Sequence, residues 1–239
     1  MNRIIVACIF LVQAVSAQDI SKEIFADSVF QSSDTLKPVK WYKSNAFKVA
    51  AVPAVLIGYS ITIMDDHGLY SSQDMYEYVQ QHHPDFHTTL DNYLTAAPAV
   101  MMYGLDAAGV KSRNNWVNQT MMLTLALATN ALLSWSTKEL TNVERPDGSD
   151  NLSYPSSHTS VSFTMAEVLH QEFKEKSTWI SISGYTFATA VGAMRILNNR
   201  HWLSDVVGGA GFGILSAKLT YLIYPKLQKK SSSERARGL

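Results

Sequence analysis

The chain has 239 residues, of which 46% are hydrophobic and 17% are charged, and its 20 basic residues balance 20 acidic ones. This length allows one domain with a substantial core, and the composition excludes an intrinsically disordered chain. A net charge of zero gives no electrostatic footprint for nucleic acid, so we expect no nucleic-acid partner.

The first residues have the pattern of a secretory signal peptide. Arg3 supplies a positive charge, residues 4–12 are apolar but too short to span a bilayer, and residues 15–17 are Val-Ser-Ala, as at a cleavage site. We therefore predict a signal peptide over 1–17, cleaved before Gln18, and export of the protein. The alternative is a buried N-terminal helix. The only cysteine, Cys8, lies inside this signal, so the mature chain is expected to have no disulfide and no thiolate metal site.

A polar arm is expected over 18–45, because this stretch is rich in Ser, Asp and Lys and contains Pro38. A shorter polar helix is predicted over 72–81, where Ser71 and Asp74 have the spacing of a capping box. Residues 226–239 are basic and rich in Ser, so a flexible tail is expected there.

Between the arm and the tail lie six apolar segments, most of them long enough for helices and none with the period-2 alternation of strands. They run near 47–64, 90–110, 116–140, 158–173, 179–197 and 203–224. The sequence therefore predicts an all-α protein, with a single domain over 46–225 that forms a bundle with a six-helix core.

Three polar stretches contain residue types that packing alone does not require. In the first, Lys138 lies near the end of the third apolar segment and Arg145 follows seven residues later, just before Pro146. Seven residues make about two helical turns, so the two cations can face the same way. The alternative is a solvated helix end whose cations suit the helix dipole.

The second stretch is a loop that leads into a helix beginning near His158. Ser156 and Ser157 precede this histidine and leave backbone N–H groups free at a helix N-terminus, which is a site for an anion. The alternative is an ordinary N-cap, for which serine is a preferred residue. An N-cap, however, does not require the histidine.

In the third stretch Arg195 is followed by His201 and, four residues later, by Asp205. On a helix these last two share a face, so the carboxylate can accept the imidazole N–H and leave the other nitrogen as a nucleophile or base. Taken alone, a His-x3-Asp pair is more often a surface pair.

Taken together and in this order, Lys-x6-Arg-Pro, Pro-Ser-x-His and Arg-x5-His-x3-Asp resemble the three-part signature of the type 2 phosphatidic acid phosphatase (PAP2) family. Its superfamily also contains bacterial non-specific acid phosphatases, glucose-6-phosphatase and vanadium haloperoxidases. The resemblance runs over about 47–224 and implies a helical bundle with all three motifs at one end. Ser157 stands where the family usually has Gly, and Met194 where it usually has Ser.

The resemblance implies a phosphatase that needs neither a metal ion nor another cofactor. Its phosphate-binding residues here are Lys138, Arg145, Ser156, Ser157 and Arg195. His201 attacks phosphorus and forms a phosphohistidine. Asp205 orients His201, and His158 protonates the leaving oxygen and then activates water.

The substrate implied is a phosphate monoester or pyrophosphate, and a lipid-linked one is favoured: phosphatidic acid, undecaprenyl pyrophosphate, phosphatidylglycerol phosphate or lipid A. The alternatives are a soluble periplasmic non-specific acid phosphatase, a vanadate-dependent haloperoxidase and a non-catalytic phospholipid-binding membrane protein. The expected location is the bacterial periplasm or cell membrane, with the site outside the cytoplasm and in contact with the membrane. The sequence does not indicate an oligomeric state.

Many relatives in this family are six-helix membrane proteins, which raises a conflict of topology. Six spans that end in a basic cytoplasmic tail need a cytoplasmic start, whereas a cleaved signal leaves the mature N-terminus outside. Either one segment does not cross or the whole bundle lies outside the cytoplasm. The fourth apolar segment is the weakest span, because Glu167, His170 and Glu172 lie within it.

Two further groups of residues have no catalytic role in this interpretation. The first joins four histidines with nearby acids, and its spacing matches no common metal pattern, so a polar cap is expected; its members are His67, His82, His83, His87, Asp65, Asp66 and Asp85. The second is a run of glycines expected to permit close helix packing: Gly208, Gly209, Gly211 and Gly213.

Overall fold

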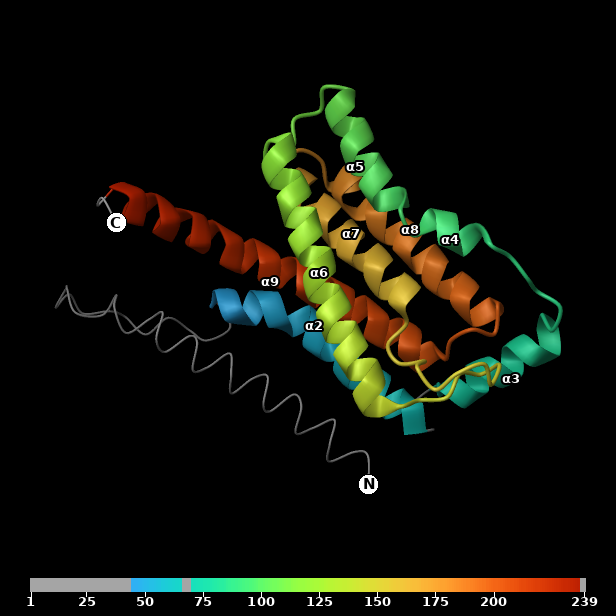
Figure 1. The fold of residues 1–239 in the computed structure, drawn as a ribbon. Coiled ribbons are helices and arrows are strands. Elements are labelled where there is room, and N and C mark those ends of the chain that lie inside the picture. Colours follow the sequence, from blue (N-terminus) through green and yellow to red (C-terminus); the bar gives the residue numbers. More distant parts are fainter. Residues whose placement is uncertain (1–43, 66–69, 237–239) are drawn as a thin grey trace. The chain divides into compact units, whose positions relative to one another are not determined.

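The structure is a computed structural model that describes residues 44–65 and 70–236 (Figure 1). The expected signal peptide, its cleavage site and nearly all of the polar arm lie outside the described residues. The chain divides into two units, 1–48 and 49–239, and the fold described below is that of the second.

Every regular element among the described residues is helical, which confirms the all-α prediction. The elements are α2 Asn45–Thr62, the 3-10 turn η2 Ile63–Asp65, α3 Ser72–His82, α4 Leu90–Leu94, α5 Ala97–Ala107, α6 Trp116–Thr141, α7 Ser157–Phe173, α8 Thr178–Leu197 and α9 Leu203–Ala236. A core of six helices stays a prediction, since the described part of the chain holds eight α-helices.

The polar helix α3 begins as its sequence predicts. The Ser71 hydroxyl accepts the Asp74 backbone N–H at 3.1 Å, and the Asp74 carboxylate accepts the Ser71 N–H at 2.8 Å. This reciprocal pair is a capping box, and it satisfies two donors that a helix N-terminus otherwise leaves open.

Two helix boundaries differ from those expected. The segment 90–110 forms two helices, because Pro98 lies in the first turn of α5 and has no N–H to donate to the Leu94 carbonyl. At the other end of the chain, α9 continues to Ala236 and includes most of the segment expected as a flexible tail.

The helix α7 lies at the centre of the bundle, packed against α6, α8 and α9 (Figure 1). The apolar core draws on α5, α6, α7 and α9, and burying these side chains supplies the main driving force for folding. Its members are Met102, Leu123, Ala126, Val168, Leu169, Phe173 and Ala217.

Glycines let α9 approach its neighbours closely, as the sequence predicted. A Cβ atom added to Gly213 would lie 2.4 Å from the Ser160 carbonyl oxygen of α7, and one added to Gly209 would lie 2.8 Å from the Ser156 carbonyl oxygen. A Cβ atom on Gly211 would meet the Ile57 side chain of α2 at 2.7 Å. The backbone of α9 therefore lies directly against the first turns of α7.

This antiparallel packing brings four helix ends together. The end of α6, the start of α7, the end of α8 and the start of α9 all lie toward the same end of the bundle (Figure 1). One backbone hydrogen bond joins two of them, because the Ser156 N–H donates to the Asp205 carbonyl oxygen at 3.0 Å.

Candidate active site

The deepest part of the site is a histidine held by a carboxylate. His201 is 3% exposed and Asp205 is 0% exposed, and His201 Nδ1 lies 3.1 Å from Asp205 Oδ2. A carboxylate without a proton can only accept, so Nδ1 carries the hydrogen and Nε2 has the free lone pair. The sequence spacing thus predicted the right pair.

The i, i+4 spacing had suggested that the two residues share a helix face, and this expectation is wrong. His201 precedes α9, which begins at Leu203, and Asp205 occupies the first turn. The Asp205 carboxylate also accepts the Trp202 backbone N–H at 2.9 Å, so it caps α9 while it orients the imidazole.

A third donor to Asp205 was not singled out from the sequence. The Ser153 hydroxyl donates to Asp205 Oδ2 at 2.5 Å and lies 3.3 Å from His201 Nδ1. Ser153 is buried in the loop before α7. Its only signal in the sequence is its place in the serine-rich second stretch, in which Ser156 and Ser157 were the residues predicted to bind phosphate.

Burial keeps the imidazole of His201 neutral. Desolvation lowers the His201 pKa to about 4, the Asp205 carboxylate opposes this shift, and the Arg145 and Arg195 guanidinium groups add to it. At the pH of most cell compartments His201 is therefore an uncharged imidazole, with a lone pair on Nε2.

Arg145 faces that lone pair. Its Nη1 lies 3.1 Å from His201 Nε2 and 3.1 Å from the Arg200 carbonyl oxygen, and its Nε donates to Asp150 at 2.8 Å. Arg145 does not lie on the same helix as Lys138, because α6 ends at Thr141 and Asn142 adopts the left-handed conformation with φ 48°. The loop, and not helical periodicity, brings this cation to the site.

Lys138 is buried beneath the loop before α7. Its ammonium donates to the carbonyl oxygens of Leu152 at 2.5 Å and Ser153 at 3.1 Å. A lysine has three N–H donors, so one remains for a substrate oxygen. Burial lowers the Lys138 pKa to about 8, and the negative charge of Asp205 opposes the shift.

Arg195, at the end of α8, forms a buried ion pair with Asp91 of α4, with Nη1 2.9 Å from Oδ2. Among the described residues, Arg195 Nε and Asp91 Oδ1 are buried without a hydrogen-bond partner. Asp91 was not predicted, and its only signal is an acidic residue at the start of an apolar segment.

The start of α7 supplies the remaining predicted residues. Ser156 is the N-cap of α7, and its amide donates to the Asp205 carbonyl oxygen while its hydroxyl accepts from Thr159 at 3.0 Å. Ser157 opens the helix, where the first amides have no partner within the helix. No positive φ is recorded at Ser157 in the described chain, so this turn accepts serine in place of glycine.

His158 lies half-buried on the first turn of α7, with Nε2 2.9 Å from Asn92 Oδ1. Burial lowers the His158 pKa below its ordinary value; Arg195 adds to the shift and Asp91 opposes it. Arg145 and Lys138 also lower this pKa, so three cations from different parts of the chain act on this one histidine.

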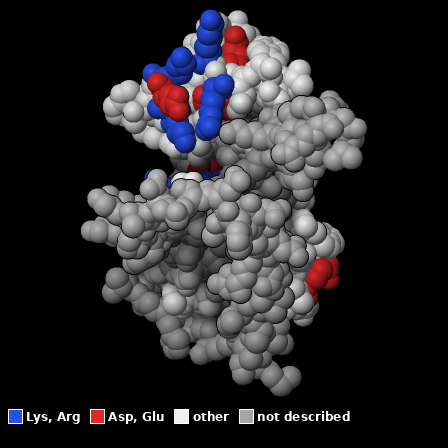
Figure 2. Space-filling model, turned by 90° about the vertical axis from the view of Figure 1, so that its left-hand side faces the viewer, with Lys and Arg blue, Asp and Glu red and all other residues white. Residues whose placement is uncertain are grey.

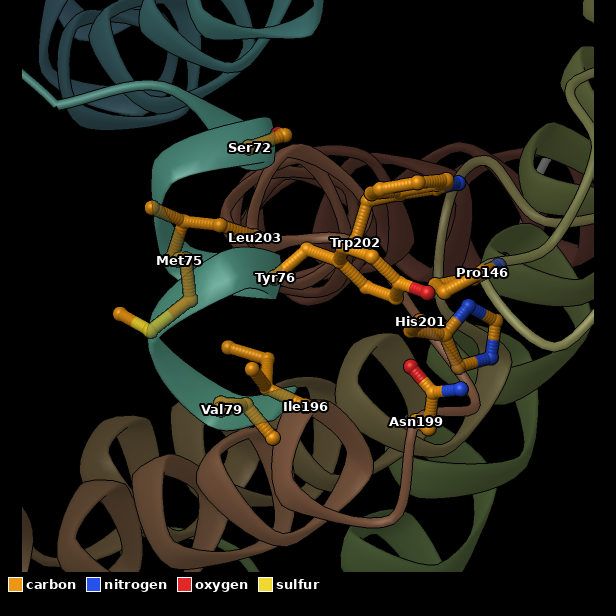
Figure 3. A pocket seen from close by; sticks show the side chains of 10 residues that line it. All are labelled: Ser72, Met75, Tyr76, Val79, Pro146, Ile196, Asn199, His201, Trp202 and Leu203. Carbon is orange, nitrogen blue, oxygen red and sulfur yellow. The ribbon is translucent and has the colours of Figure 1, made fainter. Parts of the chain in front are cut away.

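A small hollow adjoins His201 on the side of α3 (Figure 3). Tyr76 of α3 packs on Trp202, with ring centroids 5.4 Å apart, and the Trp202 indole N–H donates to the Glu144 carbonyl oxygen at 2.7 Å. Trp202 is therefore a packing residue here. The other lining residues are Ser72, Met75, Val79, Pro146, Ile196, Asn199 and Leu203.

The expected histidine cap is described only in part, because Asp66 and His67 fall outside the described residues. His82 stacks on Tyr78 with a centroid separation of 4.3 Å, and its Nδ1 lies 2.9 Å from the Tyr78 carbonyl oxygen. Within 44–65 and 70–236, no three His, Cys, Asp or Glu residues gather in a way that could hold a metal ion.

Comparison with known proteins gives the same family as the three motifs. A lipid A 1-phosphatase from Porphyromonas gingivalis is 38% identical over 139 residues, which make up 58% of this chain and 31% of that protein. The bacitracin transport permease protein BcrC of Bacillus licheniformis is 36% identical over 75 residues, or 31% of this chain and 35% of that protein. This chain thus matches only about a third of the length of either relative.

The fold also has a counterpart among solved structures. A transmembrane PAP2-type phosphatidylglycerolphosphate phosphatase from Bacillus subtilis superposes with a TM-score of 0.52 at 20% identity, over 73% of this chain and 96% of that one. The family profile described as PAP2 superfamily matches residues 77–229, well over half of the sequence. The chain therefore belongs to the PAP2 superfamily.

Proposed function

We propose that this protein is a metal-independent phosphatase that hydrolyses a lipid-linked phosphate monoester or pyrophosphate through a phosphohistidine. The observation that carries the proposal is the environment of His201: a neutral imidazole, oriented by Asp205 at Nδ1, with Nε2 3.1 Å from the Arg145 guanidinium. A nucleophile beside a cation that can hold phosphate oxygens is what in-line phosphoryl transfer requires.

In the first step His201 Nε2 forms a bond to phosphorus while the bond to the leaving oxygen breaks, and His158 gives that oxygen a proton. Arg145, Arg195 and the remaining N–H of Lys138 stabilise the charge on the phosphoryl oxygens. In the second step His158, now neutral, takes a proton from water. The resulting hydroxide attacks phosphorus, which releases phosphate and restores His201.

A lipid substrate is supported by apolar helices around the site. Three helices in the described part are long and apolar enough to cross a membrane: Asn45–Thr62, Thr178–Leu197 and Leu203–Pro225. Large apolar side chains on them face outward, with Val55 70% exposed and Trp179 81% exposed. In water such exposure is costly, whereas in contact with lipid it is not. The lipid A 1-phosphatase relative favours a lipid A type of substrate among the candidates.

Charge supports a site that faces away from the cytoplasm. The loops at the end of the bundle remote from His201 carry Lys111, Arg113, Lys174 and Lys176. Figure 2 shows Lys and Arg side chains, with some acidic ones among them, gathered at the upper end of one face, where Figure 1 places the α5–α6 connection. Short cytoplasmic loops are enriched in such residues. The active site is then on the periplasmic side.

Phosphate release by the purified full chain in detergent, with EDTA present, tests the proposal. Dispersed lipid phosphates are compared with p-nitrophenyl phosphate. We expect His201→Ala to lower kcat by about a thousandfold or more, since the nucleophile is lost. The matched control is His82→Ala, which removes an exposed histidine and is expected to keep full activity. If His201→Ala kept most of the activity, the nucleophile would be misassigned.

The alternatives predict other results in the same assay. Hydrolysis of p-nitrophenyl phosphate without hydrolysis of any lipid phosphate would favour a non-specific acid phosphatase. Halide oxidation by the vanadate-loaded protein would favour a haloperoxidase. Binding of lipid phosphates without turnover would favour a non-catalytic protein.

A further inference from the structure

The short helix α4 contacts two residues of the site from adjacent positions. Asn92 Oδ1 lies 2.9 Å from His158 Nε2, and Asp91 Oδ2 lies 2.9 Å from Arg195 Nη1. These contacts reach α7 and α8, the two helices against which α4 packs. One element therefore touches both the proposed proton donor and one of the phosphate-binding cations.

A pair of reciprocal hydrogen bonds fixes the place of α4. The Asn198 side chain, at the end of α8, accepts the Thr88 N–H at 2.9 Å and donates to the Thr88 carbonyl oxygen at 2.9 Å. Together with the Asp91–Arg195 pair, this anchors the segment that leads into Asn92 to α8 at two points. The Asn92 side chain that contacts His158 therefore belongs to a segment that is held in place by hydrogen bonds and an ion pair.

The chemistry of an amide oxygen decides which imidazole nitrogen carries the proton. A carbonyl oxygen only accepts, so His158 Nε2 must be the N–H that donates to Asn92 Oδ1, in the neutral and in the charged form alike. The nitrogen that gains and loses a proton is then Nδ1. His201 has the opposite arrangement, with the proton on Nδ1 and the lone pair on Nε2.

We propose that Asn92 is a positioning residue that keeps a proton on His158 Nε2, so that the proton transferred in catalysis moves at His158 Nδ1. The inference rests on the proposed function, because it takes His158 to be the group that protonates the leaving oxygen. Asn92 itself touches His158 and no reacting atom.

A neutral amide suits this task better than a carboxylate. The charged groups that act on His158 are Arg195 of α8, Asp91 of α4, Lys138 of α6 and Arg145 of the following loop. Only Asp91 among them is negative. A second carboxylate at position 92 would hold the proton more tightly and make His158 a weaker acid. Asparagine fixes the tautomer without that effect.

Kinetics of two variants test the proposal. With an alkyl phosphate, whose leaving oxygen needs a proton, we expect Asn92→Ala to lower kcat/KM, which reports the first step alone, by about tenfold to a hundredfold. With p-nitrophenyl phosphate, a good leaving group, we expect almost no loss of kcat/KM. An equal loss on both substrates would show a merely structural role and overturn the proposal.

Asn92→Asp keeps an acceptor in place and adds a negative charge. We expect it to retain activity and to move the alkaline limb of kcat/KM upward by about one pH unit or more. The matched control is Thr89→Asp, which puts the same charge at the N-cap of α4, where the threonine side chain makes no capping hydrogen bond. A much smaller shift is expected there. Loss of activity in Asn92→Asp as large as in Asn92→Ala would overturn the proposal.

A direct readout does not depend on turnover. Nitrogen-15 NMR of histidine-labelled protein distinguishes a protonated from an unprotonated ring nitrogen, and His158→Gln assigns the signal among the seven histidines. We expect a neutral His158 with the proton on Nε2, and a mixture of tautomers in Asn92→Ala. A proton on Nδ1 in the unmutated chain would overturn the proposal. A chain with the expected tautomer but no phosphatase activity would instead overturn the proposed function.

Discussion

The two histidines have lowered pKa values and opposite requirements, which makes the pH dependence of catalysis informative. In the proposed mechanism His201 must be neutral to attack, and its pKa of about 4 means that it is neutral above that pH. The same mechanism requires a protonated His158 as the acid, and the His158 pKa is lowered from 6.5, so we expect activity to be lost as the pH rises through a value below 6.5. We expect a bell-shaped kcat/KM profile with an acidic optimum.

The pH profile of kcat/KM should change with the leaving group of the substrate. With p-nitrophenyl phosphate the alkaline limb should be weak, because departure of the phenolate needs no proton from His158, whereas the acidic limb should stay. An alkaline limb of equal size for alkyl and phenyl phosphates would contradict the assignment of His158 as the acid.

Among single residues, the three motifs name the eight residues proposed for the site, but they do not name the residues that support them. The motifs give His201 and Asp205 by their local spacing. Ser153, Asp91 and Asn92 reach the site only through the packing of the loop before α7 and of α4, and none of them belongs to the three motifs. The position of Arg145 relative to Lys138 could not be predicted either, because Asn142, in the left-handed conformation, ends α6 between the two residues and redirects the chain.

Among the elements, the contact of α9 with α7 is the one on which the site most depends. Gly213→Ala would place a Cβ atom 2.4 Å from a backbone oxygen of α7, which cannot move aside as a flexible side chain can. We expect a lower melting temperature in detergent and reduced activity, since the first turn of α7 carries His158.

Gly104→Ala is the matched control for this substitution. Gly104 lies inside α5 with nothing within 4 Å of an added Cβ atom, so alanine should leave the protein as stable or more stable by up to about 1 kcal/mol. Equal melting temperatures of Gly213→Ala and Gly104→Ala would contradict the close packing of α9 against α7.

Most helix boundaries follow from apolar length and capping chemistry, as α3 illustrates with its capping box. The division of the 90–110 segment depends on one proline, which a search for long apolar runs passes over. That division matters for function, because it separates α4 from α5 and leaves α4 free to approach α7 and α8.

For the whole molecule, the distribution of charge predicts an orientation that labelling can test. In a Cys8→Ser background, Ser149→Cys lies on the site side and Lys176→Cys lies at the remote end; both positions are exposed. In intact spheroplasts we expect a membrane-impermeant maleimide to label Ser149→Cys at once and Lys176→Cys only after the membrane is disrupted.

Labelling of both positions before disruption would mean that the bundle lies wholly outside the cytoplasm. The α7 segment, with its buried Glu167 and Glu172, is not among the three candidate spans in the described part of the chain. The helices α5 and α6 are not among them either, so the expectation that the fourth apolar segment is the weakest span stays a prediction. Three candidate spans leave room for a topology of fewer than six crossings.

The double duty of Asp205 sets a limit on how this protein can be stabilised. Enzymes commonly gain stability when a charged active-site residue is replaced, since such residues are kept for function at the expense of the fold. Here the same carboxylate caps α9, the longest of the described helices, through the Trp202 N–H, and it accepts a hydrogen bond from Ser153 of the loop before α7. Natural selection for activity and selection for a well-formed α9 therefore act on this position in the same direction, and searches for thermostable variants should find no gain there.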